Sequence, residues 1–194
     1  MENQAHVING HDAHGHDDHH EQSFWTKYVF SQDHKMISKQ FLVTAIVMAL
    51  LAMLMSMTFR LQLGWPDNKF PFLEKIWGHW AKGGKLDPTF YLSLVTIHGT
   101  IMVFFVLTGG LSGTFSNLLI PLQIGARDMA SGFLNMLSYW FFFGSCCVMT
   151  ISVLLPDGAA SGGWTIYPPL SALPQAIGGS GIGMTLWLVS MVLF

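Results

Sequence analysis

The sequence has few charged residues, and this shortage decides its broad class. Only 10% of the 194 residues are Asp, Glu, Lys or Arg, while 51% are hydrophobic. A soluble domain of ordinary composition carries about 25% charged residues, so this composition indicates a membrane protein. The net charge of -2 is also too small to suggest binding to nucleic acid.

Cysteine is nearly absent too. The only two cysteines, Cys146 and Cys147, are adjacent in an apolar run. Adjacent side chains on a helix point about 100° apart, so the pair cannot form a CxxC-type site or a disulfide without breaking the helix. We interpret both as packing residues. We also expect no cleavable signal peptide, because the first apolar run begins near Phe41, after a long polar segment.

Residues 1–23 are predicted to form a disordered tail rich in His and Asp. The first 22 residues contain six histidines and few apolar side chains, a composition that does not support a packed core. Capture of a transition metal is one interpretation, and a solvated extension with incidental chelating power is the favoured one. Residues 24–39 mix aromatic side chains with lysine and are predicted to lie at the membrane interface.

Long apolar runs predict an all-α, multi-pass transmembrane helical bundle over residues 40–194. The expected full spans cover about 40–59, 90–120 and 129–155, each long enough to cross a hydrocarbon core about 30 Å thick. A fourth apolar run, 181–194, is too short to cross, so we expect a fragment of a larger protein. Residues 61–88 are predicted to form a loop, and Pro121 is predicted to end the second span.

His98 is the only histidine inside the expected spans, in a run without Asp, Glu, Lys or Arg. A polar ring at membrane depth is costly and suggests a function. A metal, a haem iron, a proton relay and a hydrogen bond to a neighbouring helix all remain open. By α-helical spacing, His98 shares a face with two aromatic residues, a methionine and a glycine: Tyr91, Phe105, Met102 and Gly109. Flat aromatic rings and a glycine around a histidine would suit a planar macrocycle.

Asp128 is the only carboxylate between the second and third expected spans. Two interpretations stay open: a proton-collecting group at the mouth of a polar path, or an acid that stabilises a helix macrodipole. Serines recur every seven residues in the third span and indicate either interhelical hydrogen bonds, favoured on spacing alone, or one wall of a hydrated path. Gly109 and Gly113 form a small-xxx-small pair, which predicts close approach of a neighbouring helix.

Six segments, in this order and at these separations, resemble subunit I of the haem–copper terminal oxidases of the cytochrome c oxidase type. The resemblance covers nearly all of residues 24–194 and leaves out the tail. It implies an enzyme that takes electrons from cytochrome c, reduces O2 to water and pumps protons. The segments read FSQDHKMI, FRLQLGWP, TIHGTIMVFF, GTFSNLLIPLQIGARDMA, LNMLSYW and GGWTIYPPLS.

The resemblance implies roles for five residues around one cofactor, the low-spin haem a. His98 matches an axial ligand of its iron, and Arg60 matches the arginine that hydrogen-bonds its formyl group. Tyr91 matches a family tyrosine two helical turns before the ligand. Trp164 and Tyr167 match a loop near the haem propionates.

The resemblance also implies a proton channel. Asp128 matches the acid at the entrance of the D channel, Asn117 and Asn135 match two asparagines just inside it, and Ser138 matches its wall. The sequence departs from the family at Arg127, where proline is usual, and we expect this cation to lower the pKa of Asp128. Gln62 replaces an acidic residue, which weakens the expectation of a cation site found in some members.

A high-spin haem and a copper ion are implied in the complete subunit, with histidine ligands outside this chain. The fragment alone therefore holds no catalytic residue. The implied partners are other oxidase subunits, including a copper-bearing subunit II, a cytochrome c or membrane-bound cytochrome donor, and membrane lipid, in the bacterial cytoplasmic membrane. A quinol oxidase of the same superfamily is the nearer alternative. A nitric oxide reductase is disfavoured, because those relatives generally lack the acid that Asp128 matches. The alternative of another class is a non-catalytic multi-pass subunit or transporter, with His98 and Asp128 as coupling groups.

Overall fold

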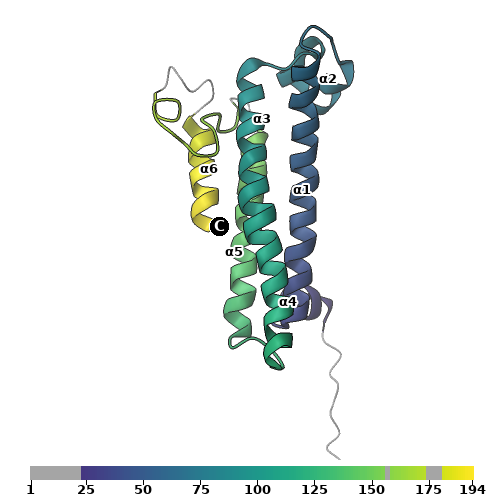
Figure 1. The fold of residues 1–194 in the computed structure, drawn as a ribbon, viewed down its shortest axis with the longest axis vertical. Coiled ribbons are helices and arrows are strands. Elements are labelled where there is room, and N and C mark those ends of the chain that lie inside the picture. The colour runs from purple at the N-terminus through teal and green to yellow at the C-terminus, as the bar shows by residue number, and fades with distance from the viewer. Residues whose placement is uncertain (1–22, 156–157, 174–180) are drawn as a thin grey trace, which may run out of the picture.

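The structure, a computed structural model, describes residues 23–155, 158–173 and 181–194; the tail predicted at 1–22 lies outside the described residues. The described part is built from helices that run side by side (Figure 1), and it contains no strand. The predicted all-α, multi-pass class is thereby confirmed. Three helical segments are long and apolar enough to cross a membrane: α1 (His34–Gly64), a rod over Pro88–Ile124 and α5 (Gly132–Val153).

Helix α1 begins before the first expected span. The Asp33 side chain caps it by accepting a hydrogen bond from the backbone N–H of Met36 at 3.3 Å. The interfacial segment predicted at 24–39 is thus divided between a π-helical turn, η1 (Trp25–Val29), and the first turns of α1. The sequence prediction started the helix later because of the charges at Lys35 and Lys39, but lysine is a good helix former.

The second membrane segment is one continuous rod made of three parts (Figure 1): α3 (Pro88–Thr100), a π-helical stretch η3 (Ile101–Leu111) and α4 (Ser112–Ile124). Asp87 accepts hydrogen bonds from Thr89 and Phe90 at its start. The prediction that Pro121 ends this span is wrong. The helix passes through Pro121 and ends at Gly125, whose φ of 68° is left-handed and favours glycine.

The π-helical stretch changes which residues share a face, because its turn is wider than that of an α-helix. Phe105 is fully buried, while Met102 is 39% exposed, so the face predicted for His98 does not continue past residue 100. The prediction of a close helix approach at Gly109 and Gly113 agrees with the structure at Gly113, where an added Cβ would meet the Phe41 ring of α1 at 2.6 Å, and needs correction at Gly109. Gly110 makes the close approach to Ala45 of α1, and a Cβ added at Gly109 would meet the rings of Phe142 and Phe194 instead.

Residues 61–88 are more ordered than the predicted loop. They form α2 (Pro71–Trp77) and the 3-10 segment η2 (Gly78–Gly84), which cover one end of the bundle (Figure 1). Trp80 stacks on Phe90 with ring centroids 5.0 Å apart, and Trp77 Nε1 donates to Thr58 Oγ1 at 3.1 Å. These contacts fix α2 and η2 on the ends of α1 and α3.

The last described helix, α6 (Gly181–Leu193), packs along α5. Ser145 Oγ donates to the Ser190 carbonyl at 2.5 Å, and Ser190 Oγ donates to the Ser145 carbonyl at 2.9 Å. Trp187 Nε1 also donates to Thr100 Oγ1 at 3.0 Å, which joins α6 to the end of α3. These buried hydroxyl and indole groups are therefore paired across helices, an arrangement that is common in membrane bundles.

Candidate functional site

His98 lies on α3, and α1 fixes its ring. His98 Nδ1 lies 2.9 Å from the carbonyl oxygen of Ala52. Because a carbonyl oxygen only accepts, Nδ1 carries the proton and donates it, which leaves the Nε2 lone pair of the neutral ring free. Phe59, two turns further along α1, meets the imidazole edge-on at a centroid distance of 5.4 Å. The ring therefore has a set tautomer and orientation, as metal-ligating histidines generally do.

The segment after α5 is tied to α3 beside His98. The Gly163 N–H donates to Thr96 Oγ1 at 3.0 Å. Trp164 then lies against Gly99, because a Cβ added to that glycine would come 3.1 Å from Trp164 Cδ1. Trp164 thus lies against the residue that follows His98 in α3, although the two segments are far apart in sequence.

The other residues predicted around the haem are placed less closely. The Tyr91 ring contacts Phe59 edge-on at 6.2 Å, so Phe59 joins it to His98. Arg60 directly follows Phe59, and its side chain is exposed. Tyr167 is 75% exposed. Tyr91 and His98 share the neighbour Phe59, and Trp164, which is 45% exposed, packs against Gly99. Arg60 and Tyr167 lie on the surface.

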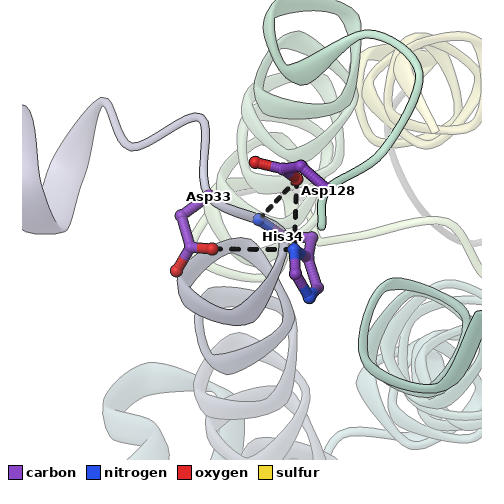
Figure 2. A group of neighbouring side chains, drawn as sticks. All are labelled: Asp33, His34 and Asp128. Carbon is purple, nitrogen blue, oxygen red and sulfur yellow. Dashed lines mark hydrogen bonds and ion pairs between the residues drawn. The ribbon is translucent and has the colours of Figure 1, made fainter. Parts of the chain in front are cut away.

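A second candidate site lies at the other end of α1, where the α4–α5 turn meets it. Figure 2 shows Asp128 pointing at the start of α1. Its Oδ1 accepts from the His34 backbone N–H at 3.3 Å and lies 3.1 Å from His34 Nδ1. Asp33 Oδ1 is 3.6 Å from the same nitrogen. The His34 side chain is 2% exposed, whereas that of Asp128 is 46% exposed, so the carboxylate connects solvent to a buried ring.

The macrodipole interpretation of Asp128 needs correction. Helix α5 begins at Gly132 with Ser131 as its cap, so Asp128 lies outside the first turn of the helix that follows it. Asp128 instead accepts from the backbone amide of His34, the first residue of α1. That amide has no partner within its own helix, and a carboxylate there interacts favourably with the positive end of the α1 dipole.

The pKa of Asp128 is lowered, but not by the residue expected to lower it. Burial alone would raise the pKa of this carboxyl; the Met129 amide and then the hydrogen bonds and charge of His34 outweigh that effect. Met129 donates to Oδ1 at 2.7 Å. Arg127 is not among the causes, so the predicted effect of this cation on Asp128 is wrong.

Two of the predicted channel residues meet between α4 and α5. Asn135 Nδ2 donates to Asn117 Oδ1 at 2.5 Å, and Asn117 Nδ2 donates to the Gly113 carbonyl at 2.7 Å. Asn117 is buried. Ser138 Oγ donates to the Asn135 carbonyl and is itself exposed. A polar strip therefore runs from the buried Asn117 through the half-buried Asn135 to the exposed Ser138 on the outside of α5.

The serines of α5 do not share one role, although their spacing is regular. Ser131 caps the helix, and Ser138 bonds to its own backbone one turn earlier. Ser145 forms the reciprocal pair with Ser190 of α6, and Ser152 bonds to the Met149 carbonyl. Interhelical bonding explains one of the four positions.

Comparison with known proteins identifies the family of the chain. The family model described as "Cytochrome C and Quinol oxidase polypeptide I" matches residues 36–194. The chain belongs to the haem–copper oxidase subunit I family. The family is one of multi-pass membrane proteins that carry haem and copper, which agrees with the three membrane segments.

Three curated relatives of this haem–copper oxidase chain illustrate the match. It is 41% identical over 175 residues to the alternative cytochrome c oxidase subunit 1 of Bradyrhizobium diazoefficiens, covering 90% of this chain and 27% of that protein. It is 36% identical over 170 residues to cytochrome c oxidase subunit 1 of Thermostichus vulcanus, covering 87% and 27%. It is 34% identical over 148 residues to quinol oxidase subunit 1 of Bacillus subtilis, covering 76% and 20%. The chain thus spans about a quarter of their length or less.

The residues around His98 fit the haem that this family binds. A haem iron takes a neutral imidazole nitrogen, and the His98 Nε2 lone pair is the one that the bond to Ala52 leaves free. Sequence reasoning missed Ala52 and Phe59, because neither a backbone acceptor nor a packing ring has a sequence signature. It also missed His34, although its place after the capping Asp33 indicates a helix start.

Proposed function

We propose that this chain is part of the catalytic subunit I of a respiratory terminal oxidase that takes electrons from cytochrome c, reduces O2 to water and pumps protons. The observation that carries the proposal is the hydrogen bond from His98 Nδ1 to the Ala52 carbonyl, which prepares Nε2 as a ligand at membrane depth. The high-spin haem and the copper centre are held by histidines outside this chain.

His98 is the proposed axial ligand of a low-spin haem a, which carries electrons toward the oxygen-reducing centre when bound. The Ala52 carbonyl fixes the ring and raises the basicity of the ligating nitrogen. Arg60 is proposed to donate to the haem formyl group, and its exposed side chain leaves the guanidinium available. Trp164, which packs against Gly99, and Tyr167 are proposed to lie near the haem propionates. Tyr91 is joined to the imidazole ring of His98 through Phe59.

Asp128 is the proposed entrance of the D proton channel. It is half-exposed, its carboxylate is held by His34 and Met129, and the Asn117–Asn135 pair lies nearby on α4 and α5. Ser138 continues the polar strip. On this proposal, protons collected at Asp128 pass along α4 and α5 toward the Asn117–Asn135 pair.

The proposed location is the bacterial cytoplasmic membrane, with other oxidase subunits, including a copper-bearing subunit II, as partners. Cytochrome c is the proposed donor, because two of the three relatives named above are cytochrome c oxidase subunits. The alternative donor is quinol, as the Bacillus subtilis relative is a quinol oxidase subunit. Oxygen consumption by the complete complex with reduced cytochrome c or with a quinol as the only donor decides between them.

The haem proposal is tested with His98→Ala in the complete subunit. We expect loss of the low-spin a-type signal from the reduced-minus-oxidised spectrum, because the variant removes the iron ligand. Met53→Leu is the matched control: it lies next to Ala52 on α1 but is 52% exposed, so the signal should persist. An unchanged low-spin spectrum in His98→Ala would refute the assignment.

The channel proposal has its own test. Asp128→Asn should reduce the number of protons pumped per electron in proteoliposomes, because an amide cannot collect protons from solvent. Gln123→Glu, in the same α4–α5 region, is a control that changes charge without touching the carboxylate. Wild-type stoichiometry in Asp128→Asn would count against the channel.

A further inference from the structure

Gln62, in the last turn of α1, joins three segments of the chain through its side-chain amide. Its Oε1 accepts from the Leu86 backbone N–H at 3.1 Å, and its Nε2 donates to the Pro66 carbonyl oxygen at 3.3 Å. Pro66 lies in the turn that follows α1, and Leu86 lies in the linker between η2 and α3. One half-buried side chain therefore holds the end of α1, this turn and the linker together.

The linker depends on Gln62 for a hydrogen-bond acceptor. Leu86 is only 8% exposed and packs in the core, and a buried backbone N–H needs a partner. The carboxylate of the next residue, Asp87, is already engaged, because its Oδ1 accepts from the Thr89 and Phe90 amides at the start of α3. Gln62 thus fixes the start of α3 relative to the end of α1.

The two neighbours of Gln62 require an amide at this position. A backbone N–H only donates and a carbonyl oxygen only accepts, so they need one acceptor and one donor between them. A carboxylate offers acceptors only. Glutamate at position 62 would satisfy Leu86 with one oxygen and would place the other against the Pro66 carbonyl oxygen, with no hydrogen between the two oxygens.

Two facing oxygens at such a separation suit a hard cation. Ca²⁺ binds oxygen ligands at about 2.3–2.6 Å, so two ligands at right angles lie roughly 3.3–3.7 Å apart. The negative end of the α1 dipole also disfavours an anion in the last turn of the helix, unless a cation compensates its charge. A glutamate at this position would therefore call for a cation, whereas the neutral glutamine does not.

We propose that the Gln62 amide takes the place of a bound cation in this chain, so that α1 and the linker before α3 are joined without an ion. The resemblance to the oxidase subunits makes an acidic residue usual at this position and a cation site a feature of some members. The donor set of this chain does not fit such a cation, because a Gln62 N–H points at the carbonyl oxygen that would bind it. The inference rests on the contacts of one side chain and does not depend on the haem or on the proton channel.

The test follows amide hydrogen–deuterium exchange by mass spectrometry in the complete oxidase complex, with millimolar Ca²⁺ or with EGTA. Two peptides are compared: one contains Leu86, and the other contains Asn68, whose N–H closes the turn after α1 by donating to the Trp65 carbonyl at 3.2 Å. Exchange in the wild type should be the same in both solutions. Gln62→Ala removes both contacts of the amide, so both peptides should exchange several-fold faster, again without an effect of Ca²⁺.

Gln62→Glu is the variant that should create a dependence on the cation. In EGTA its second oxygen repels the Pro66 carbonyl, so the peptide with Asn68 should exchange faster than in the wild type. Ca²⁺ should restore the slower exchange by joining the two oxygens. Gln123→Glu is the matched control, because it makes the same change of charge at an exposed position of α4 and should leave both peptides unchanged.

The outcomes separate the proposal from a cation site that glutamine has kept. Slower exchange of the wild type in Ca²⁺ than in EGTA would show that an ion still holds this end of α1 and would overturn the proposal. Wild-type exchange of Gln62→Glu in EGTA, or faster exchange that Ca²⁺ does not reverse, would overturn it as well. An ion-independent wild type together with a Ca²⁺-dependent Gln62→Glu would support it.

Discussion

Gly110 offers the sharpest test of the helix packing, because its environment differs so clearly from that of another helical glycine. A Cβ added at Gly110 would collide with the Cβ of Ala45 and lie 2.7 Å from the Phe105 carbonyl oxygen, neither of which can move away easily. At Gly144 of α5, a Cβ would meet nothing within 4 Å. The same substitution to alanine therefore adds a clash at one site and none at the other.

The two substitutions should change the free energy of unfolding in opposite directions. Gly144→Ala should stabilise by about 0.5–1 kcal/mol, because glycine inside a helix is less favourable than alanine by that amount. Gly110→Ala gains the same helix preference but forces α1 and η3 apart, and overpacking costs about 1–3 kcal/mol. At Gly99 the added Cβ would sit 3.1 Å from Trp164, which is 45% exposed and can yield, so we expect a net change near zero.

Thermal unfolding of the purified complex, followed by tryptophan fluorescence, measures this order. We expect Gly144→Ala to unfold at or above the wild-type temperature, Gly99→Ala near it, and Gly110→Ala several degrees below it. Equal stability of Gly110→Ala and Gly144→Ala would refute the close contact between α1 and η3.

Three further predictions concern the polar groups. His34→Ala should raise the pKa of Asp128, because it removes a hydrogen bond and a charge that favour the carboxylate. The acid limb of the pH profile of proton uptake should then move to higher pH. His34→Asn keeps a hydrogen-bond donor and should move that limb less. Ser145→Ala removes one hydrogen bond between α5 and α6 and should cost about 0.5–1.5 kcal/mol in thermal unfolding. Ser190 Oγ keeps the carbonyl of residue 145 as its acceptor, so the double variant with Ser190→Ala should lose a second bond and be less stable still. Asp128→Asn should leave the midpoint potential of the proposed low-spin haem within about 25 mV of the wild type in a spectroelectrochemical titration, although we expect it to impair pumping.

The linkage between Asp128 and stability has a definite sign. Its pKa is lower in the folded chain than its ordinary value, so folding favours the charged form. The stabilisation is present above the ordinary pKa and is lost as pH falls through the lowered one. A group that is half-exposed contributes little, so this effect should appear only as a shallow slope in acid.

Composition and hydrophobic length were sufficient to predict the fold class, because a membrane helix must bury its own backbone and needs about 20 apolar residues. They could not predict the π-helical stretch at Ile101–Leu111, since nothing in the composition distinguishes it from an α-helix. The error at Phe105 and Gly109 follows directly from that. The helix α2 was missed because it is short and its main contacts, Trp77 and Trp80 on the bundle end, are tertiary.

At the candidate sites, too, some features could be predicted from the sequence and others could not. His98 and Asp128 could be found from sequence because a lone ionisable group in an apolar run is conspicuous. Their partners could not, because a backbone carbonyl such as that of Ala52 has no sequence signature, and His34 meets Asp128 only through the packing of α1 on the α4–α5 turn. The family resemblance supplied roles for single positions, whereas the geometry supplied the groups that orient them.

The two candidate sites are too far apart to act on each other directly. His34 and Ala52, which hold Asp128 and His98 respectively, are separated along α1 by roughly 27 Å, at about 1.5 Å per residue. Two unit charges at that distance interact by only about 0.6 kcal/mol at an effective dielectric constant near 20, and salt at the exposed mouth reduces this further. On the proposed roles, Asp128 would therefore supply protons without tuning the haem strongly, which is why its amide variant should leave the potential nearly unchanged. Coupling between electron transfer and proton uptake must pass through groups that lie between the two ends.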